Sequence, residues 1–332
     1  MKLGAMGDVL ASTPVFKALN ERRNEILHHL VFDECAVITK NNPYIKKVIS
    51  VTNFGRNSLI RKISFLISYY SLLIFGGYDR VYVLSDNPYL KLAAYSVYGR
   101  RVFSYFFEIF GCKLIDGPRF NSLRSQTLRE LDIVGESLLR NNFDTKLEFY
   151  RVGIDEVNCS INKPYIVINP GAGNILASGH NKRWPAESFA KLIEKLNVQV
   201  VLVGAGNDDE AVAEKITSMC SSHIINLVNK TKFEKTSLIL QESELFIGND
   251  SSLLYLCEAI SVKAIGIYGP TSSNIYRPLG NFVHPIASSY RCAPCYDPLD
   301  GIDGEMYKCQ RNRCMENVTV ESVFNKAMEL LK

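Results

Sequence analysis

A glycine-containing loop near the middle of the chain carries residue types that bind phosphate. It follows the strand-like run Tyr165–Asn169, contains Gly171 and Gly173, and leads to Lys182. A diphosphate is held by cations and by exposed backbone N–H donors, and an ammonium is a compact charge suited to a phosphate oxygen. We therefore predict a diphosphate-binding loop with Lys182 as its cation. We expect Trp184, the single tryptophan, to pack this loop against a sheet.

A polar turn at the start of a predicted helix is a second candidate for anion binding. Asp250, Ser251 and Ser252 follow a strand-like run and open a helix that we expect to end at Ile260. The first N–H groups of a helix have no intrahelical partner, and the helix dipole is positive there. We expect Asp250 to orient backbone or bind a hydroxyl, because a carboxylate repels phosphate. An ordinary capped helix is the alternative.

Asp8 is the candidate general base. It follows two glycines, Gly4 and Gly7. It precedes a helix that we expect to begin at Pro14, with Thr13 as the N-cap. Gly7 lets a ligand approach the backbone closely. A carboxylate within about 3 Å of an acceptor hydroxyl can take its proton. The competing interpretation is that Asp8 only caps a helix, which is a common role for aspartate.

An acidic run follows a third glycine-containing turn. Asp208 and Asp209 come after Gly204 and Gly206, and an acidic side chain there could bind the hydroxyls of a ribose. The dinucleotide fingerprint G-x-G-x-x-G is incomplete, because Asp209 occupies the position of the third glycine. Acidic residues also favour the start of a helix without any ligand, and both interpretations stay open.

Four cysteines lie close together near the C-terminal end. They are Cys292, Cys295, Cys309 and Cys314, out of nine in the chain. In a chain without a secretory signal, such a group is more typical of a structural metal site than of disulfides, and zinc would take four thiolates. Reduced thiols without a metal are the alternative. We predict a structural Zn site, with no part in catalysis.

The candidate residues follow strand-like segments in a chain that alternates strands and helices. In the first half, the pattern predicts strands at 26–32, 48–52 and 80–84 and helices at 14–23, 58–75, 88–98 and 125–141. In the second half, it predicts strands at 165–169, 198–203, 224–227, 245–247 and 264–268 and helices at 185–196, 208–220, 233–241, 251–260 and 320–331. Such alternation indicates an α/β fold with parallel sheets covered by helices on both faces.

The length of 332 residues favours two domains, because one hydrophobic core seldom serves more than about 250–300 residues. Weak periodicity between Arg151 and Pro164 indicates the boundary. We predict a first domain at 1–155, a second at 160–316 with a cysteine-rich loop at 291–314, and a C-terminal helix within 317–332.

The composition fits a globular protein, with 47% hydrophobic and 22% charged residues. A net charge of +4 without a basic cluster argues against a nucleic-acid partner. The longest uncharged run, Ile63–Tyr78, is shorter than the about 20 residues of a membrane-spanning helix, and the first residues resemble no signal peptide. We therefore expect a cytoplasmic protein.

The Gly4–Asp8 loop has the character of a turn that follows a first strand, yet only three residues precede it. Either the first strand is truncated, or Met1–Leu3 form a stub and a neighbouring strand covers the gap.

Taken in order, these loops resemble those of glycosyltransferase family 9, the heptosyltransferases of lipopolysaccharide core assembly. The resemblance covers most of the chain and is strongest at Leu3–Pro14, Asn169–Pro185 and Phe246–Gly280. The stretch from Ile247 through the turn Gly269-Pro270-Thr271 is the most specific part.

The resemblance implies a GT-B fold, with two Rossmann-like domains facing across a cleft, an acceptor side in the first and a nucleotide-sugar site in the second. It implies an inverting transfer that needs no metal cofactor, from an ADP-heptose-like donor to a hydroxyl of a lipopolysaccharide-core-type acceptor. The catalytic candidates are Asp8 and Lys182. The donor-binding candidates are Gly7, Gly171, Gly173, Ser178, Asp208, Asp209, Asp250, Ser251 and Ser252.

The expected partners are a nucleotide-sugar donor and a lipid-linked or oligosaccharide acceptor at the inner face of the cytoplasmic membrane. The predicted helix 58–75, flanked by Arg56, Arg61 and Lys62, would contact anionic lipid or, alternatively, pack in the core. Two other functions remain open. One is a nucleotide-sugar epimerase or hydrolase of the same architecture. The other is a non-catalytic nucleotide-sugar binding protein, suggested by Ser252 and Tyr255 where the family usually has glycine and often histidine.

Overall fold

The computed structural model describes residues 1–52, 67, 69–72, 74–96, 101–135, 143–151, 161–172, 179–221 and 224–332. They form two compact units, Met1–Thr145 and Lys146–Lys332. The division falls ten positions before residue 155, where the sequence predicts the first domain to end, and residues 152–160 lie outside the described part. The C-terminal helix belongs to the second unit.

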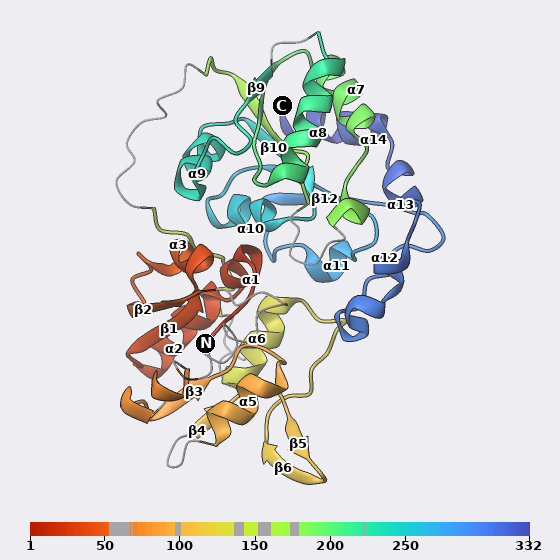
Figure 1. Cartoon of the computed structure of the whole chain (residues 1–332). Helices are drawn as coiled ribbons and strands as arrows, with labels where there is room; N and C mark the ends of the chain where they lie inside the picture. The colour runs from red at the N-terminus through yellow and green to blue at the C-terminus, as the bar shows by residue number, and fades with distance from the viewer. Residues whose placement is uncertain are drawn as a thin grey trace. The chain divides into compact units, whose positions relative to one another are not determined.

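The first unit contains two pairs of parallel strands and one antiparallel hairpin (Figure 1). The parallel pairs are β1 (Leu27–Phe32) with β2 (Ile45–Val51) and β3 (Arg80–Tyr82) with β4 (Arg101–Phe103). The hairpin joins β5 (Phe107–Ile109) to β6 (Cys112–Ile115). The helices with bounds within the described residues are α1 (Met6–Ala11), α2 (Thr13–Arg23), η1 (Asp33–Cys35), α3 (Ala36–Thr39), α5 (Pro88–Tyr95) and α6 (Gln126–Val134), and residues 69–72 and 74–75 are also helical.

Two hydrophobic clusters cover opposite faces of these strands. Side chains of α2 and α6 pack with Tyr82 and Leu84 in one cluster. Tyr69 and side chains of α5 pack with Val81 and Val83 in the other. Because neighbouring residues of a strand point to opposite faces, the alternation along 81–84 shows that helices lie on both sides of this sheet.

Met1 and Lys2 connect the two parallel pairs. The Met1 nitrogen donates to the Tyr82 carbonyl at 2.6 Å, and the Leu84 N–H donates to the Met1 carbonyl at 3.0 Å. The Lys2 N–H donates to the Leu30 carbonyl at 3.2 Å. These two residues therefore connect β1 to the β3 segment through backbone hydrogen bonds.

The second unit is built on a six-stranded parallel sheet in the order β12-β11-β10-β7-β8-β9. The strands are β7 (Tyr165–Asn169), β8 (Gln199–Leu202), β9 (Ile224–Asn226), β10 (Leu245–Asn249), β11 (Ala264–Tyr268) and β12 (Val283–Ala287). The chain starts in the middle at β7, builds outward to β9, and returns beside β7 as β10. This is the Rossmann order, and the switch point between β7 and β10 is where such sheets bind ligands.

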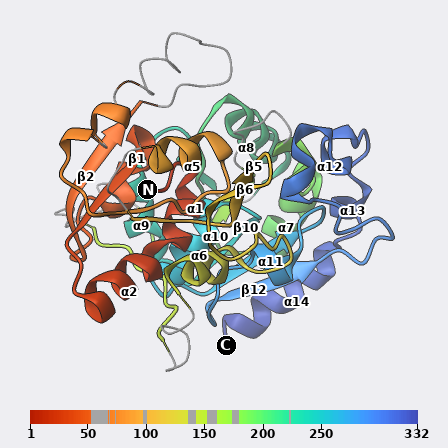
Figure 2. The same ribbon diagram turned by 90° about the horizontal axis from the view of Figure 1, so that it is seen from below.

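Helices cover both faces of this sheet (Figure 1 and Figure 2). The described helices of this unit are η3 (Gly179–Lys182), α7 (Ala186–Leu196), α8 (Asn207–Met219), α9 (Phe233–Gln241), α10 (Ser252–Ala259), α11 (Ser273–Tyr276), η4 (Pro298–Asp303), α12 (Glu305–Lys308), α13 (Arg313–Glu316) and α14 (Val320–Leu330). Side chains of α7, α8 and α14 form the main core with the strands. The parallel α/β architecture confirms the fold class predicted from the alternation.

Some predicted elements differ from the structure. The Gly4–Asp8 segment, predicted as a turn, largely forms α1, because Asp8 accepts from the backbone of Ala5 and starts a helix there. Thr13 lies inside α2 and Ser12 is the N-cap residue, although its side chain makes no capping hydrogen bond. Most of the predicted helix 58–75, and the end of 125–141, lie outside the described residues. Among the described helices, none is long and apolar enough to cross a membrane.

Candidate functional site

Asn249 holds together the loops at the switch point of the second unit. It ends β10 and is fully buried. Its side-chain amide donates to the carbonyls of Pro170 at 2.9 Å and Gly171 at 3.0 Å, and its Oδ1 accepts the Trp184 N–H at 2.9 Å. One side chain therefore fixes the loop after β7 and the segment that carries Lys182.

Lys182 and Asp250 form an ion pair beside Asn249. The Lys182 ammonium lies 3.1 Å from Asp250 Oδ2 and 3.5 Å from the Asp250 carbonyl oxygen. The Asp250 side chain is only 8% exposed, whereas the Lys182 side chain is 24% exposed. The carboxylate thus holds the ammonium in place while leaving part of it open to solvent. Asp250 orients a cation, which extends the predicted role of orienting backbone.

Three hydroxyl groups at or after the ends of β10 and β11 have no hydrogen-bond partner among the described residues. They belong to Ser251 after β10, Tyr268 at the end of β11 and Thr271 in the following turn. Thr271 and Tyr268 are buried, and burial raises the pKa of the Tyr268 phenol well above its usual value. Buried polar groups are normally satisfied, so unpaired hydroxyls at the carboxyl edge of a sheet are typical of a ligand site.

Arg183 is engaged with the acidic run at the start of α8. Its guanidinium lies 3.2 Å from Asp209 Oδ1 and 3.6 Å from Asp208 Oδ2. Asp209 also accepts the Ala205 N–H at 3.2 Å. Burial raises the pKa of the Asp209 carboxyl, and the Ala205 and Arg183 contacts oppose that rise. Asp208 has the more accessible side chain, 60% exposed.

Gly171 is required where it stands. A Cβ at this position would collide with the Asp209 carboxylate, which packs directly on the Gly171 backbone. The loop after β7 and the start of α8 are therefore in contact through a glycine and a buried acid.

Trp184 and Tyr255 serve the scaffold around the site. The Trp184 ring is buried against Phe189, and its Nε1 donates to the Val318 carbonyl at 2.8 Å. This confirms the expectation that the tryptophan packs its loop against the sheet. The Tyr255 hydroxyl donates to the Tyr276 carbonyl at 2.8 Å, which attaches α10 to α11.

Asp8 lies in the first unit, within the first turn of α1. Its Oδ2 accepts the Ala5 N–H at 2.9 Å, and its backbone carbonyl accepts from Ser12 Oγ and from Gln126 Nε2. A Cβ on Gly4 would lie 2.7 Å from Asp8 Oδ2, so Gly4 makes room for the carboxylate. The capping interpretation is thus observed, while one oxygen of the carboxylate makes no hydrogen bond among the described residues.

The second unit brings together Lys182, Asp250 and Ser251, with Gly171 and Asp209 beside them. Ser252 is the first residue of α10, and Gly7 is buried in α1. Gly173 and Ser178 lie outside the described residues. The sequence motifs include Asn249 and Thr271 without a role for either, and they include Arg183 as a second cation of the loop, whereas the structure pairs Arg183 with Asp209. Asn249 ends the buried strand β10 and Thr271 lies in the turn after β11, and these positions are signals that the sequence could have supplied.

Two of the four late cysteines, Cys295 and Cys314, lie beside the Gly269-Pro270 turn. The Cys295 N–H donates to the Pro270 carbonyl at 2.9 Å, and a Cβ on Gly269 would lie 3.0 Å from Cys314 Sγ. Burial raises the pKa of the Cys314 thiol to about 11, and the nearby Cys295, Cys292 and Cys309 add to the rise. Among the described residues, no group of three or more His, Cys, Asp or Glu has the geometry of a metal site.

Known proteins resemble this chain in sequence and in fold. The model of glycosyltransferase family 9 (heptosyltransferase) matches residues 124–303, just over half of the chain. Lipopolysaccharide heptosyltransferase 3 of Escherichia coli strain K12 is 25% identical over 322 residues, covering 89% of each chain.

Two solved structures resemble the whole chain. The family 9 glycosyltransferase of Veillonella parvula superposes with a TM-score of 0.79 at 18% identity, covering 99% of this chain and 95% of that one. The E. coli heptosyltransferase WaaC with ADP-2-deoxy-2-fluoro heptose gives a TM-score of 0.67 at 14% identity, covering 99% and 98%. These likenesses confirm the predicted GT-B fold. With the match of the family model, they establish that the chain is a glycosyltransferase and belongs to glycosyltransferase family 9, the heptosyltransferase family.

Proposed function

We propose that the chain transfers a heptose from ADP-heptose, with inversion at the anomeric carbon, to a hydroxyl group of a lipopolysaccharide-core acceptor. The observation that carries this proposal is the half-open Lys182–Asp250 pair at the switch point, next to unpaired hydroxyls. The relatives support the same donor and acceptor, since one is a lipopolysaccharide heptosyltransferase and another was solved with an ADP-heptose analogue.

Lys182 is proposed to bind the diphosphate of the donor. Asp250 holds its ammonium at 3.1 Å beside the start of α10. A diphosphate there would meet the ammonium, the first N–H groups of the helix, and the hydroxyls of Ser251 and Thr271. These groups are fixed before the donor arrives, so they can stabilise the negative charge that builds on ADP as the bond breaks.

Asp8 is proposed to be the general base. The acceptor oxygen attacks the anomeric carbon as the bond from that carbon to the ADP oxygen breaks, and the acceptor proton passes to the Asp8 carboxylate. ADP departs with the electron pair of the broken bond. Because Oδ2 is held by the Ala5 N–H, the other carboxylate oxygen is the one that would accept the proton.

The substitution Asp8→Asn tests this role, because an asparagine can still accept from Ala5 and so keeps the start of α1. We expect transfer from ADP-heptose to fall by roughly 10²–10⁴-fold while ADP affinity is unchanged. Full transfer by the variant would remove Asp8 as the base. Turnover of the donor without any acceptor would favour the epimerase or hydrolase, and tight donor binding without turnover would favour a binding protein.

We propose that the acceptor is reached at the inner face of the cytoplasmic membrane, with the first unit in peripheral contact. Exposed apolar side chains on two neighbouring helical segments support this. Phe75 is 83% exposed and Tyr89 is 75% exposed. The two segments are attached by a hydrogen bond from the Tyr69 hydroxyl to the Leu90 carbonyl, 3.3 Å long. Aromatic side chains of this kind enter the headgroup region.

Co-sedimentation with phosphatidylglycerol vesicles tests this contact. We expect binding that weakens at least several-fold in the variant Phe75→Ser/Tyr89→Ser. The matched control is Leu299→Ser, a comparably exposed leucine of the second unit (63%). Equal binding by all three proteins would exclude this surface.

We also propose that the four late cysteines bind a structural metal ion such as Zn. Four nearby thiols fit the ligands that zinc prefers, although their sulfurs must move closer than they stand. Elemental analysis of the purified protein checks this. We expect about one metal ion per chain and its loss in Cys292→Ser/Cys295→Ser. A metal-free protein of unchanged stability would overturn the proposal.

A further inference from the structure

Residues on both sides of Lys182 are attached to one later stretch of the chain. We call this stretch, residues 306–318, the clamp segment. The buried amide of Asn181 donates to the carbonyl of its first residue at 2.7 Å, and the Trp184 indole donates to the carbonyl of its last residue at 2.8 Å. The loop that carries the proposed diphosphate cation is therefore fixed from outside as well as by its own turn.

Asn312, in the middle of the clamp segment, bridges the backbone on the two sides of Lys182. Its Nδ2 donates to the carbonyl of His180 at 3.2 Å and to the carbonyl of Arg183 at 3.0 Å. An amide nitrogen carries two hydrogens, so these two carbonyls use both of them. The bridge closes across the turn on which Lys182 stands.

The side chain of Asn312 makes this bridge instead of capping its own helix. Asn312 is the N-cap residue of α13, a position at which an asparagine usually accepts from the first N–H groups of the helix. Its side chain makes no such bond, and its Oδ1 accepts from the Cys314 thiol at 3.5 Å. Departure from a local preference of this kind is expected where a side chain has another task.

The backbone of Asn312 is itself held firmly. Its carbonyl accepts the N–H groups of Met315 at 3.0 Å and of Glu316 at 3.2 Å. Met315 and Cys314 are buried in the main core of the second unit, which attaches α13 to the sheet and its helices. Asn312 therefore ties the turn of Lys182 to an element that is packed into the core.

The Lys182 ammonium is placed both by Asp250 and by the backbone from which its side chain starts. Asp250 holds the ammonium at 3.1 Å, while the four-carbon stem of a lysine is flexible. A shift of the turn would therefore move the ammonium or break its ion pair. Because a misplacement of about 1 Å can cost about 10²-fold in rate, the position of this turn matters for transfer.

We propose that Asn312 is a positioning residue for Lys182, because its amide fixes the turn from which the lysine reaches the diphosphate of the donor. This role rests on the proposed function of Lys182 as the diphosphate cation. Asn312 acts through the backbone on either side of the lysine and needs no contact with the donor. Since Asn312 lies between Cys309 and Cys314, the cysteine-rich loop takes part in donor binding through this residue.

The substitution Asn312→Asp tests this role, since it keeps the shape of the side chain and replaces the donating nitrogen by an oxygen that repels both carbonyls. We expect kcat/KM for transfer from ADP-heptose to fall by about 10–100-fold and the Kd for ADP to rise several-fold. Asn312→Ala should give the same result without adding a charge. The matched control is Asn317→Asp in the same segment, because Asn317 accepts from Ser288 and Ser289 through Oδ1, an oxygen that aspartate retains.

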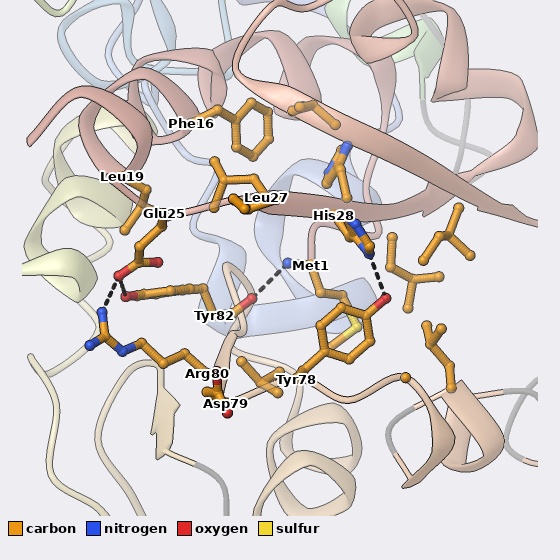
Figure 3. A pocket seen from close by; sticks show the side chains of 18 of the residues that line it. Met1, Phe16, Leu19, Glu25, Leu27, His28, Tyr78, Asp79, Arg80 and Tyr82 are labelled. Carbon is orange, nitrogen blue, oxygen red and sulfur yellow. Dashed lines mark hydrogen bonds and ion pairs between the residues drawn. The ribbon is translucent and has the colours of Figure 1, made fainter. Parts of the chain in front are cut away.

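A double-mutant cycle separates positioning from a merely structural role. In the Lys182→Ala background, Asn312→Asp should lower kcat/KM by less than about twofold, because no ammonium remains to be positioned. Glu25→Ala is the control for lost stability, since it removes the carboxylate that Arg80 and Tyr82 contact in the first unit (Figure 3). It should lower the Tm and leave kcat/KM unchanged.

Wild-type kcat/KM in both Asn312 variants would overturn the positioning role, and so would a loss of equal size with and without Lys182. If Lys182→Ala alone keeps wild-type kinetics, the failure lies in the proposed function of Lys182, and the positioning role falls with it.

Discussion

Lys182 and Asp250 show how a single charged pair can prepare a site for an anion. The carboxylate is nearly buried and the ammonium is partly open, so the pair is oriented without being closed off from solvent. A dianionic ligand can join the ammonium while Asp250 continues to hold it. The pair thus fixes the position of a positive charge before any ligand is present.

The substitution Lys182→Ala should lower kcat/KM for heptose transfer by roughly 10²–10³-fold, because it removes a preorganised charge from the leaving group. Steady-state kinetics with ADP-heptose measures this. Lys195→Ala is the matched control, since the Lys195 ammonium lies over the Phe324 ring and pairs with the exposed Glu321, and exposed ion pairs contribute little. If both variants keep wild-type kinetics, Lys182 does not act on the diphosphate.

His29 makes the stability of the first unit depend on pH. Burial lowers the pKa of His29 well below 6.5, and the charges of the Met1 amine and Lys2 lower it further. The folded protein therefore binds fewer protons at this site than the unfolded chain does. The neutral ring contributes stability that is complete above pH 6.5 and is lost as the pH falls below it.

We expect the free energy of unfolding to decrease by up to about 1.4 kcal/mol for each pH unit below 6.5 through this group. Urea denaturation between pH 5 and 7 measures how the free energy of unfolding changes with pH. The variant His29→Gln should show a smaller pH dependence, because it lacks this one titrating group. An unchanged pH dependence in the variant would show that His29 binds its proton equally in the folded and unfolded states, which would contradict the lowered pKa.

At the scale of elements, β7 and α8 depend on each other through Gly171 and Asp209. Gly171→Ala should destabilise the second unit by about 1–3 kcal/mol, because the added Cβ would collide with the buried carboxylate. Thermal or urea unfolding measures this cost. In Gly171→Ala/Asp209→Ala the collision is relieved, so the double variant should lose less stability than the sum of the two single variants. Additive losses would show that the two residues are not coupled.

The sequence predicts the second unit better than the first. The bounds of β7, β11 and α9 are as predicted. The two strands were recognisable because buried parallel strands are continuous apolar runs between polar turns. The edge strand β12 was missed, since its sequence includes His284 and Pro285 and alternates with exposed residues. In the first unit, the short strands β4, β5 and β6 lack the length that makes a pattern recognisable.

The candidate site was predictable in part. Strand-end loops identified Lys182 and Asp250 separately, because ligands bind at the carboxyl ends of parallel strands. That the two side chains pair was not predictable, since they are 68 positions apart and only the order β10-β7 brings their loops together. The same applies to Asp209, whose contact with Arg183 depends on how α8 packs. The roles assigned to these residues stay predictions.

At the scale of the whole molecule, two units with separate hydrophobic clusters need not unfold together. The proposed ADP groups Lys182, Asp250 and Ser251 all belong to the second unit. We expect ADP at 100 times its Kd to stabilise that unit by about 2.7 kcal/mol and to raise its unfolding transition, leaving the transition of the first unit in place. Calorimetry with and without ADP measures this.

UDP and Lys182→Ala are the controls for that experiment. The shift should be smaller with UDP and smaller in the variant. A larger shift with UDP than with ADP would contradict the proposed base of the donor, and a shift confined to the first unit would contradict the proposed location of the nucleotide.

Trp184 gives the protein an optical probe of its own. It is the only tryptophan in the chain, it is buried, and it lies two positions after Lys182. Its backbone N–H donates to the Asn249 side chain. Selective excitation of tryptophan therefore reports on the Lys182 loop and on the segments that contact the indole, Phe189 and Val318. Movement of that loop on ligand binding would alter the emission of the indole, so the kinetics of donor capture can be followed without attaching a dye.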